Sequence, residues 1–154
     1  MADEAHKRRF TEEVSRFFES MGFPPMAGRV WAALLVAEEP HLAAADLQEQ
    51  IGASAGAIST AITDLNRLGL IERVWIPGSR RNYYAAPTSA LDRLLERRAE
   101  ALTTMVDLAE RGVETFAGVE RAAERLTYLR DLYTWFDREY DILLERWRAE
   151  RPNS

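Results

Sequence analysis

Apolar residues recur every three or four positions along most of the chain, which is the periodicity of amphipathic helices. This pattern stops only once, between Leu70 and Ala86, where two β-branched and aromatic runs flank Pro77-Gly78 and predict a β-hairpin. The fold is therefore expected to be mainly α with one small hairpin. The expected helices run over residues 7–21, from Pro24-Pro25 to before Pro40, over 44–51, from Ser54 to Gly69, from Thr88 to a break near Gly118, and from that break past Trp147.

Composition narrows the class of protein. The 154 residues include no cysteine and only two histidines, so we expect no disulfide, no metal site and no cofactor. The longest apolar run, Val30 to Ala37, has eight residues, against about 20 for a membrane helix. The N-terminus is charged with no apolar stretch behind it, unlike a signal peptide. These features predict a soluble, cytoplasmic protein without membrane contact.

The net charge of −5 conceals a reversal of sign along the chain. Residues 1–53 carry 9 acidic and 5 basic side chains, residues 54–98 carry 4 and 7, and residues 99–154 carry 12 and 8. The central block is thus positive by three charges, whereas each flank is negative by four. Basic charge confined to one block favours a polyanionic partner for that block.

The central segment, Ala44 to Ala86, has the order helix, tight turn, helix, hairpin, which is that of a winged helix-turn-helix. Gly52 supplies the turn, and Ser54 suits the cap of the second helix. The exposed face of that helix is expected to be slim and hydrogen-bonding, as entry into a DNA major groove about 12 Å wide requires. The residues on this face expected to contact DNA are Ser54, Ala55, Gly56, Ser59, Thr60, Thr63 and Arg67.

The hairpin tip adds Arg80 and Arg81 beside Gly78. An arginine on a short turn fits a DNA minor groove, above all a narrow A·T-rich one. Either feature alone is also explained as a solvated surface, but the helix face and the arginines together predict DNA binding. The alternative is a winged-helix protein-interaction module without DNA binding, which the net acidity favours and the paired arginines oppose. The sequence leaves open which arginine enters the groove.

One motif points toward catalysis. Gly52-Ala-Ser-Ala-Gly56 matches the G-x-S-x-G pattern of serine hydrolases. That pattern requires a strand before the serine and a histidine after it. Here a helix is expected before Ser54, and His6 and His41 both precede it. We therefore expect Ser54 to be a helix cap and the chain not to be an enzyme.

In combination, several segments resemble the MarR superfamily, most closely its GbsR-like branch found in actinobacteria. They are Gly28-Arg-Val-Trp-Ala-Ala-Leu-Leu-Val36, Ala45-Asp-Leu47, Gly52-Ala-Ser-Ala-Gly-Ala-Ile-Ser-Thr60, Leu68-Gly-Leu-Ile-Glu-Arg73 and Gly78-Ser-Arg-Arg81. The resemblance implies a homodimeric transcriptional regulator, typically a repressor, on a palindromic operator that it releases when a lipophilic small molecule binds.

The resemblance also carries residues over to this chain. It places Ser54, Ser59 and Thr60 against DNA, and Arg80 or Arg81 at the position of the wing arginine. Many family members have an aspartate two positions before that arginine, which orients it. Gly78 and Ser79 occupy the corresponding positions here, so the sequence does not show how the wing arginine is held.

The flanking helices carry more aromatic bulk than an exposed amphipathic helix needs, which predicts a two-fold homodimer. The alternative is packing of two helices within one chain. We expect residues 24–87 to form the DNA-binding domain, and 1–23 with 88–154 to form a helical dimerisation region. The residues expected at the dimer interface are Phe10, Leu129, Leu132, Trp135, Phe136, Leu143 and Trp147.

A ligand pocket is expected between the terminal helices and the winged domain. Methionine and aromatic side chains adapt to apolar ligands, although they also fill ordinary cores. The family resemblance favours the pocket, with a lipophilic small molecule as its effector. The residues expected to line it are Phe17, Phe23, Met26, Trp31, Met105, Leu108 and Phe116.

Overall fold

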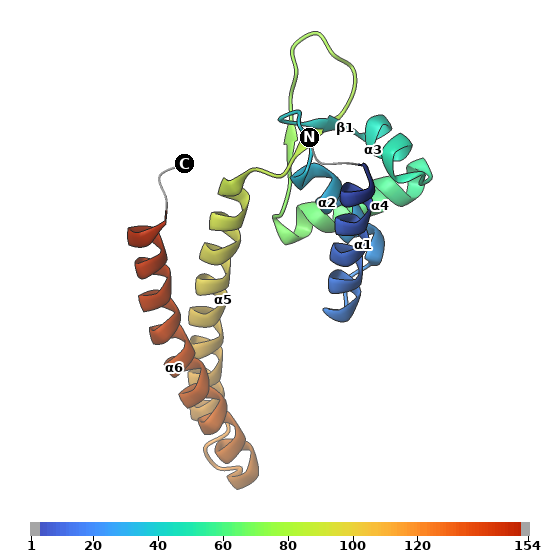
Figure 1. Cartoon of the computed structure of the whole chain (residues 1–154). Helices are drawn as coiled ribbons and strands as arrows, with labels where there is room; N and C mark the ends of the chain where they lie inside the picture. The colour runs from blue at the N-terminus through green and yellow to red at the C-terminus, as the bar shows by residue number, and fades with distance from the viewer. Residues whose placement is uncertain (1–3, 152–154) are drawn as a thin grey trace. The chain divides into compact units, whose positions relative to one another are not determined.

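The computed structural model describes residues 4–151 (Figure 1). Its helices fall where the periodicity predicts them, and the expected class, mainly α with a small winged hairpin, is confirmed. The elements follow in the order α1 (Glu4–Ser20), α2 (Pro25–Leu35), β1 (Leu42–Ala43), α3 (Ala44–Ile51), α4 (Ala55–Leu68), β2 (Glu72–Val74), β3 (Tyr83–Ala85), α5 (Thr88–Thr115) and α6 (Glu120–Glu150). No helix within residues 4–151 is long and apolar enough to cross a membrane.

The chain is divided into two compact units, and the division falls inside α5, after Leu94. The first unit contains α1 to α4, the sheet and the first residues of α5, and the second contains the rest of α5 and α6. The domain boundary predicted at residue 87 lies at the start of α5, a few residues before this division. Helix α1, which we expected to belong with the dimerisation region, lies in the first unit.

The sheet has three antiparallel strands in the order β1-β3-β2, so the prediction of a two-stranded hairpin was incomplete. The additional strand, β1, places Leu42 opposite Tyr84 and Ala43 opposite Tyr83. Two residues are too few to show strand alternation, and both are buried, so the sequence carried no signal for β1. The strand ends where α3 begins, and it therefore joins the helix pair directly to the wing.

The core of the first unit is built from the predicted inward faces of the helices. Leu47 of α3, Ile58 and Leu65 of α4, and Val30 of α2 are its largest fully buried side chains. Gly52 ends α3 in the left-handed conformation, with φ +71°, which glycine adopts without the strain that a side chain brings. The chain can therefore turn sharply enough for α4 to follow after only two further residues.

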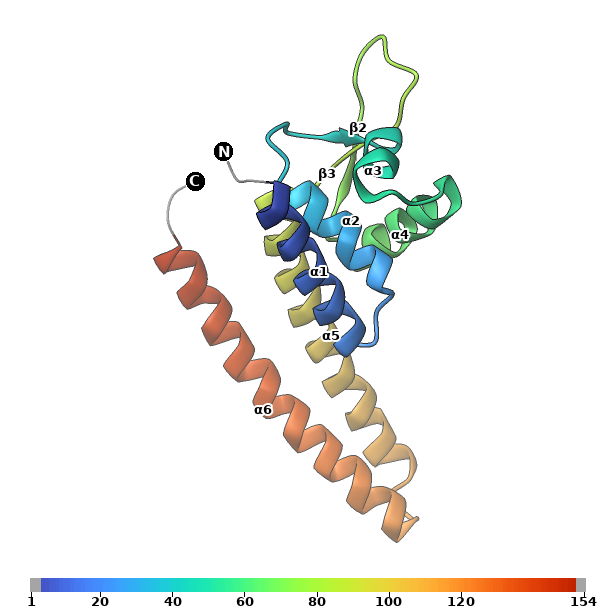
Figure 2. The ribbon, with the colours of Figure 1, turned by 45° about the vertical axis from the view of Figure 1, so that its right-hand side comes forward.

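Helices α1 and α2 lie side by side (Figure 2), and their backbones are in close contact at Gly28. A Cβ at that position would lie 2.9 Å from the Cα atom of Ser15 and 2.9 Å from the carbonyl oxygen of Val14. Ser15 is buried, and its hydroxyl donates a 3.1 Å hydrogen bond to the carbonyl of Pro25. The absence of a side chain on Gly28 is thus what allows α1 to pack on α2.

In the second unit, α5 and α6 lie side by side and antiparallel, joined by a short turn (Figures 1 and 2). The Thr103 hydroxyl donates to a carboxylate oxygen of Asp137 at 2.7 Å, and the Tyr140 hydroxyl donates to the carbonyl of Leu95 at 3.2 Å. Near the turn, a Cβ on Gly112 would lie 3.0 Å from a methyl group of Leu126. These contacts fix the register of the two helices.

Candidate nucleic-acid interface

Helix α4 begins with the predicted serine cap. Ser54 has extended backbone, and its hydroxyl oxygen accepts a 3.2 Å hydrogen bond from the backbone N–H of Ala57. The preceding segment, Ala44–Ile51, is helix α3 rather than a strand, so the G-x-S-x-G sequence is not a hydrolase elbow. The serine stabilises the start of the helix.

The outer face of α4 is open to solvent, as predicted. Ile58, Ala61 and Ile62 are buried on the inner face, whereas a Cβ added to Gly56 would meet no atom within 4 Å. This face can therefore approach a partner without any rearrangement of the helix. The structure places on it, all exposed, the predicted residues Ser54, Ala55, Gly56, Ser59, Thr60, Thr63 and Arg67.

A groove of about 390 Å³ separates α4 from the sheet. Ser59 and Thr63 line it from the helix, and Arg73 and Asn82 line it from the base of the wing. The Arg73 guanidinium donates a 2.5 Å hydrogen bond to the side-chain oxygen of Asn82. We had not predicted a role for Arg73 or Asn82. The available signal was strand alternation, which puts Arg73 on the opposite side of the sheet from its neighbours Glu72 and Val74.

The wing is the loop of residues 75–82, which projects beyond the sheet in both views (Figures 1 and 2). Gly78 turns the loop with φ +80°, and the hydroxyl of Ser79 accepts a 3.2 Å hydrogen bond from the backbone N–H of Arg81. Arg80 is exposed, and its guanidinium makes no hydrogen bond or ion pair with any residue from 4 to 151. Trp75, at the start of the loop, is 79% exposed.

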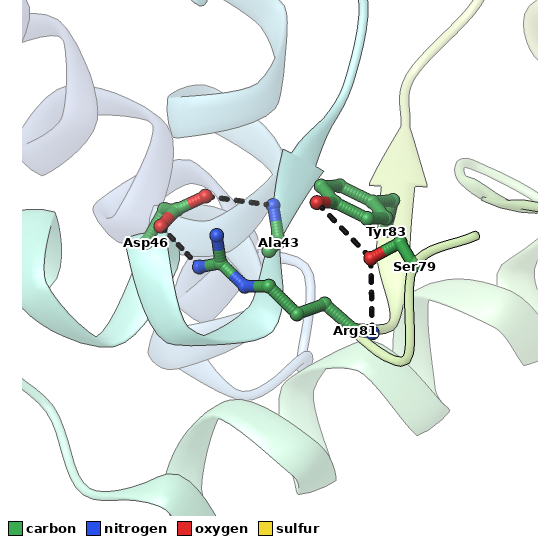
Figure 3. Close-up of polar contacts among 5 residues, drawn as sticks. All are labelled: Ala43, Asp46, Ser79, Arg81 and Tyr83. Carbon is green, nitrogen blue, oxygen red and sulfur yellow. Dashed lines mark hydrogen bonds and ion pairs between the residues drawn. The ribbon is translucent and has the colours of Figure 1, made fainter. Parts of the chain in front are cut away.

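Arg81 behaves differently from Arg80, because an acid on α3 binds it (Figure 3). One carboxylate oxygen of Asp46 accepts a 2.5 Å hydrogen bond from the Arg81 guanidinium, and the other accepts a 3.2 Å hydrogen bond from the backbone N–H of Ala43. The guanidinium carbon also lies 5.8 Å from the centre of the Tyr83 ring. Arg81 therefore contacts α3 through Asp46 and β3 through Tyr83, so it is held relative to both the helix and the sheet.

The same pair shifts two pKa values. The hydrogen bond from Arg81 lowers the pKa of Asp46, because it stabilises the ionised carboxylate. The hydrogen bond to Asp46 raises the pKa of Arg81 for the reciprocal reason. Asp46 was not among the predicted site residues, because it stands 35 residues before its partner in the chain. Its one local signal was its place in the first turn of α3, where an acid favours the helix N-terminus.

Most residues predicted for the dimer interface are at least partly open to solvent in the single chain. Trp135 and Leu143 are 50% and 57% exposed, and the rings of Trp135 and Phe136 pack edge to face with centroids 5.1 Å apart. Leu129 and Leu132 are partly buried, and Phe10 of α1 is 39% exposed. An apolar face this large on α6 is unusual for a helix that remains in water.

The residues predicted to line an effector pocket are divided between the two units. In the first unit, the Phe18 ring packs against the rings of Phe23 and Trp31 at centroid distances of 6.0 and 5.6 Å. Phe17 points outward and is 59% exposed, and Met26 packs against the core. Met105, Leu108 and Phe116 belong to the second unit. The effector pocket stays a prediction.

Comparison with known proteins gives a consistent result. Residues 89–150 match the family model of MmpR5-like MarR family transcriptional regulators. The HTH-type transcriptional regulator MmpR5 of Mycobacterium tuberculosis (strain ATCC 25618 / H37Rv) is 29% identical over 148 residues, which cover 96% of this chain and 90% of that protein. A crystal structure of a transcriptional regulator is 28% identical, with a TM-score of 0.81, over 94% of this chain and 99% of that chain. The finer assignment to a GbsR-like branch stays a prediction.

Proposed function

We propose that this chain, which is similar to MarR family transcriptional regulators, is a regulator of that family and binds double-stranded DNA through α4 and the wing. The observation that carries the proposal is the open outer face of α4, with Gly56 in its first turn, together with a projecting loop that bears two arginines. The family consists of transcriptional regulators rather than enzymes, which agrees with Ser54 as a helix cap. The expected cytoplasmic location is part of the same proposal.

Each part of this surface has a task set by its chemistry. The N-terminal turn of α4 has small side chains, so its backbone can come close to the floor of the major groove. Ser54, Ser59 and Thr60 are exposed hydroxyl groups there, which donate to phosphates and accept from or donate to base edges. The wing then reaches the neighbouring minor groove, where an arginine is attracted by the negative potential of A·T-rich DNA.

We further propose that the protein is a homodimer that reads a palindrome. The exposed apolar face of α6, with Trp135 and Trp147, is the surface that a second copy would cover. A two-fold axis would place two copies of α4 about 34 Å apart, one turn of DNA, so that both enter successive major grooves. The matching operator is an inverted repeat.

The proposed output is repression that a lipophilic small molecule relieves. A ligand that prefers a dimer with its α4 helices at another spacing shifts the population away from the DNA-binding state. A hundredfold difference in ligand affinity between the two states corresponds to about 2.7 kcal/mol, which is enough to empty an operator held at modest excess. The residues proposed to bind this ligand are the seven predicted from the sequence: Phe17, Phe23, Met26, Trp31, Met105, Leu108 and Phe116.

The test is selection of sheared genomic DNA with the purified protein at about 150 mM salt, followed by sequencing. Fragments that share an inverted repeat are expected. If the protein enriches no sequence, even after refolding from denaturant to remove bound ligand, the DNA-binding proposal is wrong and the interaction-module alternative takes its place.

Substitution of Gly56 then tests the surface itself. A Cβ at Gly56 meets no atom within 4 Å, so Gly56→Leu extends a side chain from the open face of α4; the fold should survive while affinity for the selected DNA falls at least tenfold. Gly56→Ala is the matched variant, because it adds one carbon in the same place, and we expect a smaller loss. Equal affinities for the native protein and both variants would remove α4 from the interface.

A further inference from the structure

The two wing arginines are adjacent in sequence but have different surroundings. Building on the proposed DNA binding, we propose that Arg80 is the wing residue that contacts DNA, and that Asp46 and Arg81 form a latch that holds the wing against α3. The sequence treats the two arginines as equivalent. The fold distinguishes their roles, because it brings a carboxylate of α3 to only one of them.

Arg81 already makes several contacts within the protein. Its guanidinium is bound to Asp46 and lies over the ring of Tyr83, and its backbone N–H donates to the hydroxyl of Ser79. That hydroxyl in turn donates a 3.4 Å hydrogen bond to the Tyr83 hydroxyl (Figure 3). For Arg81 to enter a groove it would have to leave Asp46, and the free carboxylate would then face the DNA phosphates.

Arg80 has the opposite character. It is exposed, stands two residues after the turn at Gly78, and pairs with no residue from 4 to 151. It therefore reaches DNA without breaking any contact of its own, and its whole charge is available to a phosphate or to the minor groove.

The latch acts at a point where the wing and the helix pair already meet. Asp46 caps α3 by accepting from the N–H of Ala43, the last residue of β1. The next N–H, that of Ala44, donates a 3.1 Å hydrogen bond to the carbonyl of Asn82 in the wing. The Asp46–Arg81 pair extends this attachment outward by one residue. A loop ordered before DNA arrives loses less conformational entropy on binding.

The strength of the latch follows from its exposure. The side chains of Arg81 and Asp46 are 49% and 40% exposed, and ion pairs in contact with water are weak. Breaking the latch should therefore weaken DNA binding only about two- to fivefold, whereas loss of a direct arginine contact should weaken it about tenfold or more.

The direction in which one substitution changes DNA affinity distinguishes a latch residue from an ordinary surface charge. Removing an acidic group near DNA reduces repulsion and by itself tightens binding. If Asp46 is a latch residue, Asp46→Asn should instead weaken binding, because Arg81 is released. Asparagine keeps a side-chain oxygen that can accept from Ala43, so the cap of α3 survives. Glu49→Gln is the matched control, because Glu49 lies on the same helix, is exposed and forms no ion pair with residues 4–151.

The experiment measures affinity for the selected operator by fluorescence anisotropy between 50 and about 200 mM salt. Arg80→Gln should bind about tenfold more weakly with a shallower salt dependence. Asp46→Asn should bind two- to fivefold more weakly with an unchanged salt dependence, and Glu49→Gln should not weaken binding. The double variant Asp46→Asn/Arg81→Gln should bind no more weakly than Arg81→Gln alone, since both remove one interaction.

Two other outcomes overturn the assignment. Tighter binding by Asp46→Asn, with a shallower salt dependence for Arg81→Gln, would make Arg81 the DNA contact and Asp46 its competitor. Full affinity in Arg80→Gln would also remove Arg80 from the interface. In either case, a loss of affinity in Gly56→Leu shows that α4 still binds DNA, so the latch proposal is wrong while the proposed DNA binding stands. If Gly56→Leu also binds normally, the proposed function fails as well.

Discussion

The close packing of α1 on α2 at Gly28 predicts that Gly28→Ala destabilises the protein. In Gly28→Ala the new methyl group would lie 2.9 Å from two backbone atoms of α1, the Cα of Ser15 and the carbonyl oxygen of Val14. An ordinary contact starts near 3.4 Å. Because both atoms belong to the backbone, relief requires α1 to shift rather than one side chain to rotate.

Three contributions set the expected free energy. Overpacking of this kind costs about 1–3 kcal/mol. Displacement of α1 also strains the buried Ser15–Pro25 hydrogen bond, which contributes about 1 kcal/mol. Alanine is favoured over glycine in a helix by about 1 kcal/mol, which offsets the second contribution. We therefore expect Gly28→Ala to lower the free energy of unfolding by about 1–3 kcal/mol.

Urea denaturation at a fixed protein concentration measures this loss, since a dimer would otherwise make the midpoint depend on concentration. With a slope of about 2 kcal/mol/M, the midpoint should fall by roughly 0.5–1.5 M. Gly56→Ala is the control, because it adds the same methyl group to open space in α4 and should raise stability by up to about 1 kcal/mol. The packing argument is refuted if Gly28→Ala is as stable as the native protein while Gly56→Ala is stabilised as expected.

Three further predictions concern other parts of the chain. Ser54→Ala removes the cap of α4 and should cost about 1 kcal/mol in urea denaturation, whereas Ser54→Asp, which still caps, should not. Arg81 lowers the pKa of Asp46, so the stability that this pair provides is present above the ordinary carboxyl pKa of about 4 and is lost as the pH falls through the lowered pKa of Asp46. In an acid titration, the difference in free energy of unfolding between the native protein and Asp46→Asn should therefore shrink below about pH 4. Trp135→Glu should shift the protein to monomer in sedimentation, whereas an unchanged mass would exclude the α6 face as the interface.

The sequence predicted the helices well because each has a local cause. Periodicity fixed their buried faces, and Gly52 with Ser54 fixed the turn between α3 and α4 at the level of single residues. The open face of α4 followed from the same periodicity, since the positions opposite Ile58 and Ile62 must point outward. These features are local: the residues that determine them are neighbours both in sequence and in space.

The features that were missed all join distant parts of the chain. Strand β1 exists only because β3 lies beside it, and the Asp46–Arg81 pair depends on that sheet for its geometry. The close approach at Gly28 likewise depends on Ser15 of another helix. Gly28 has a negative φ and lies inside a helix, so no local feature of the backbone explains why a glycine stands at this position. The proposed dimer and effector pocket need partners that a single chain does not contain.

The junction at Ala43 and Ala44, where β1 passes into α3 without an intervening residue, also decides where this chain can change length. An insertion there would shift α3 along the sheet and break the pairing of Ala43 with Tyr83. The segments of residues 36–41 and 75–80 lie outside the paired strands and before the attachment of Arg81 and Asn82 to α3, so they can lengthen without such a shift. Changes in the reach of the wing are therefore open to natural variation or design, while the spacing between the sheet and the two helices behind the binding face stays constant.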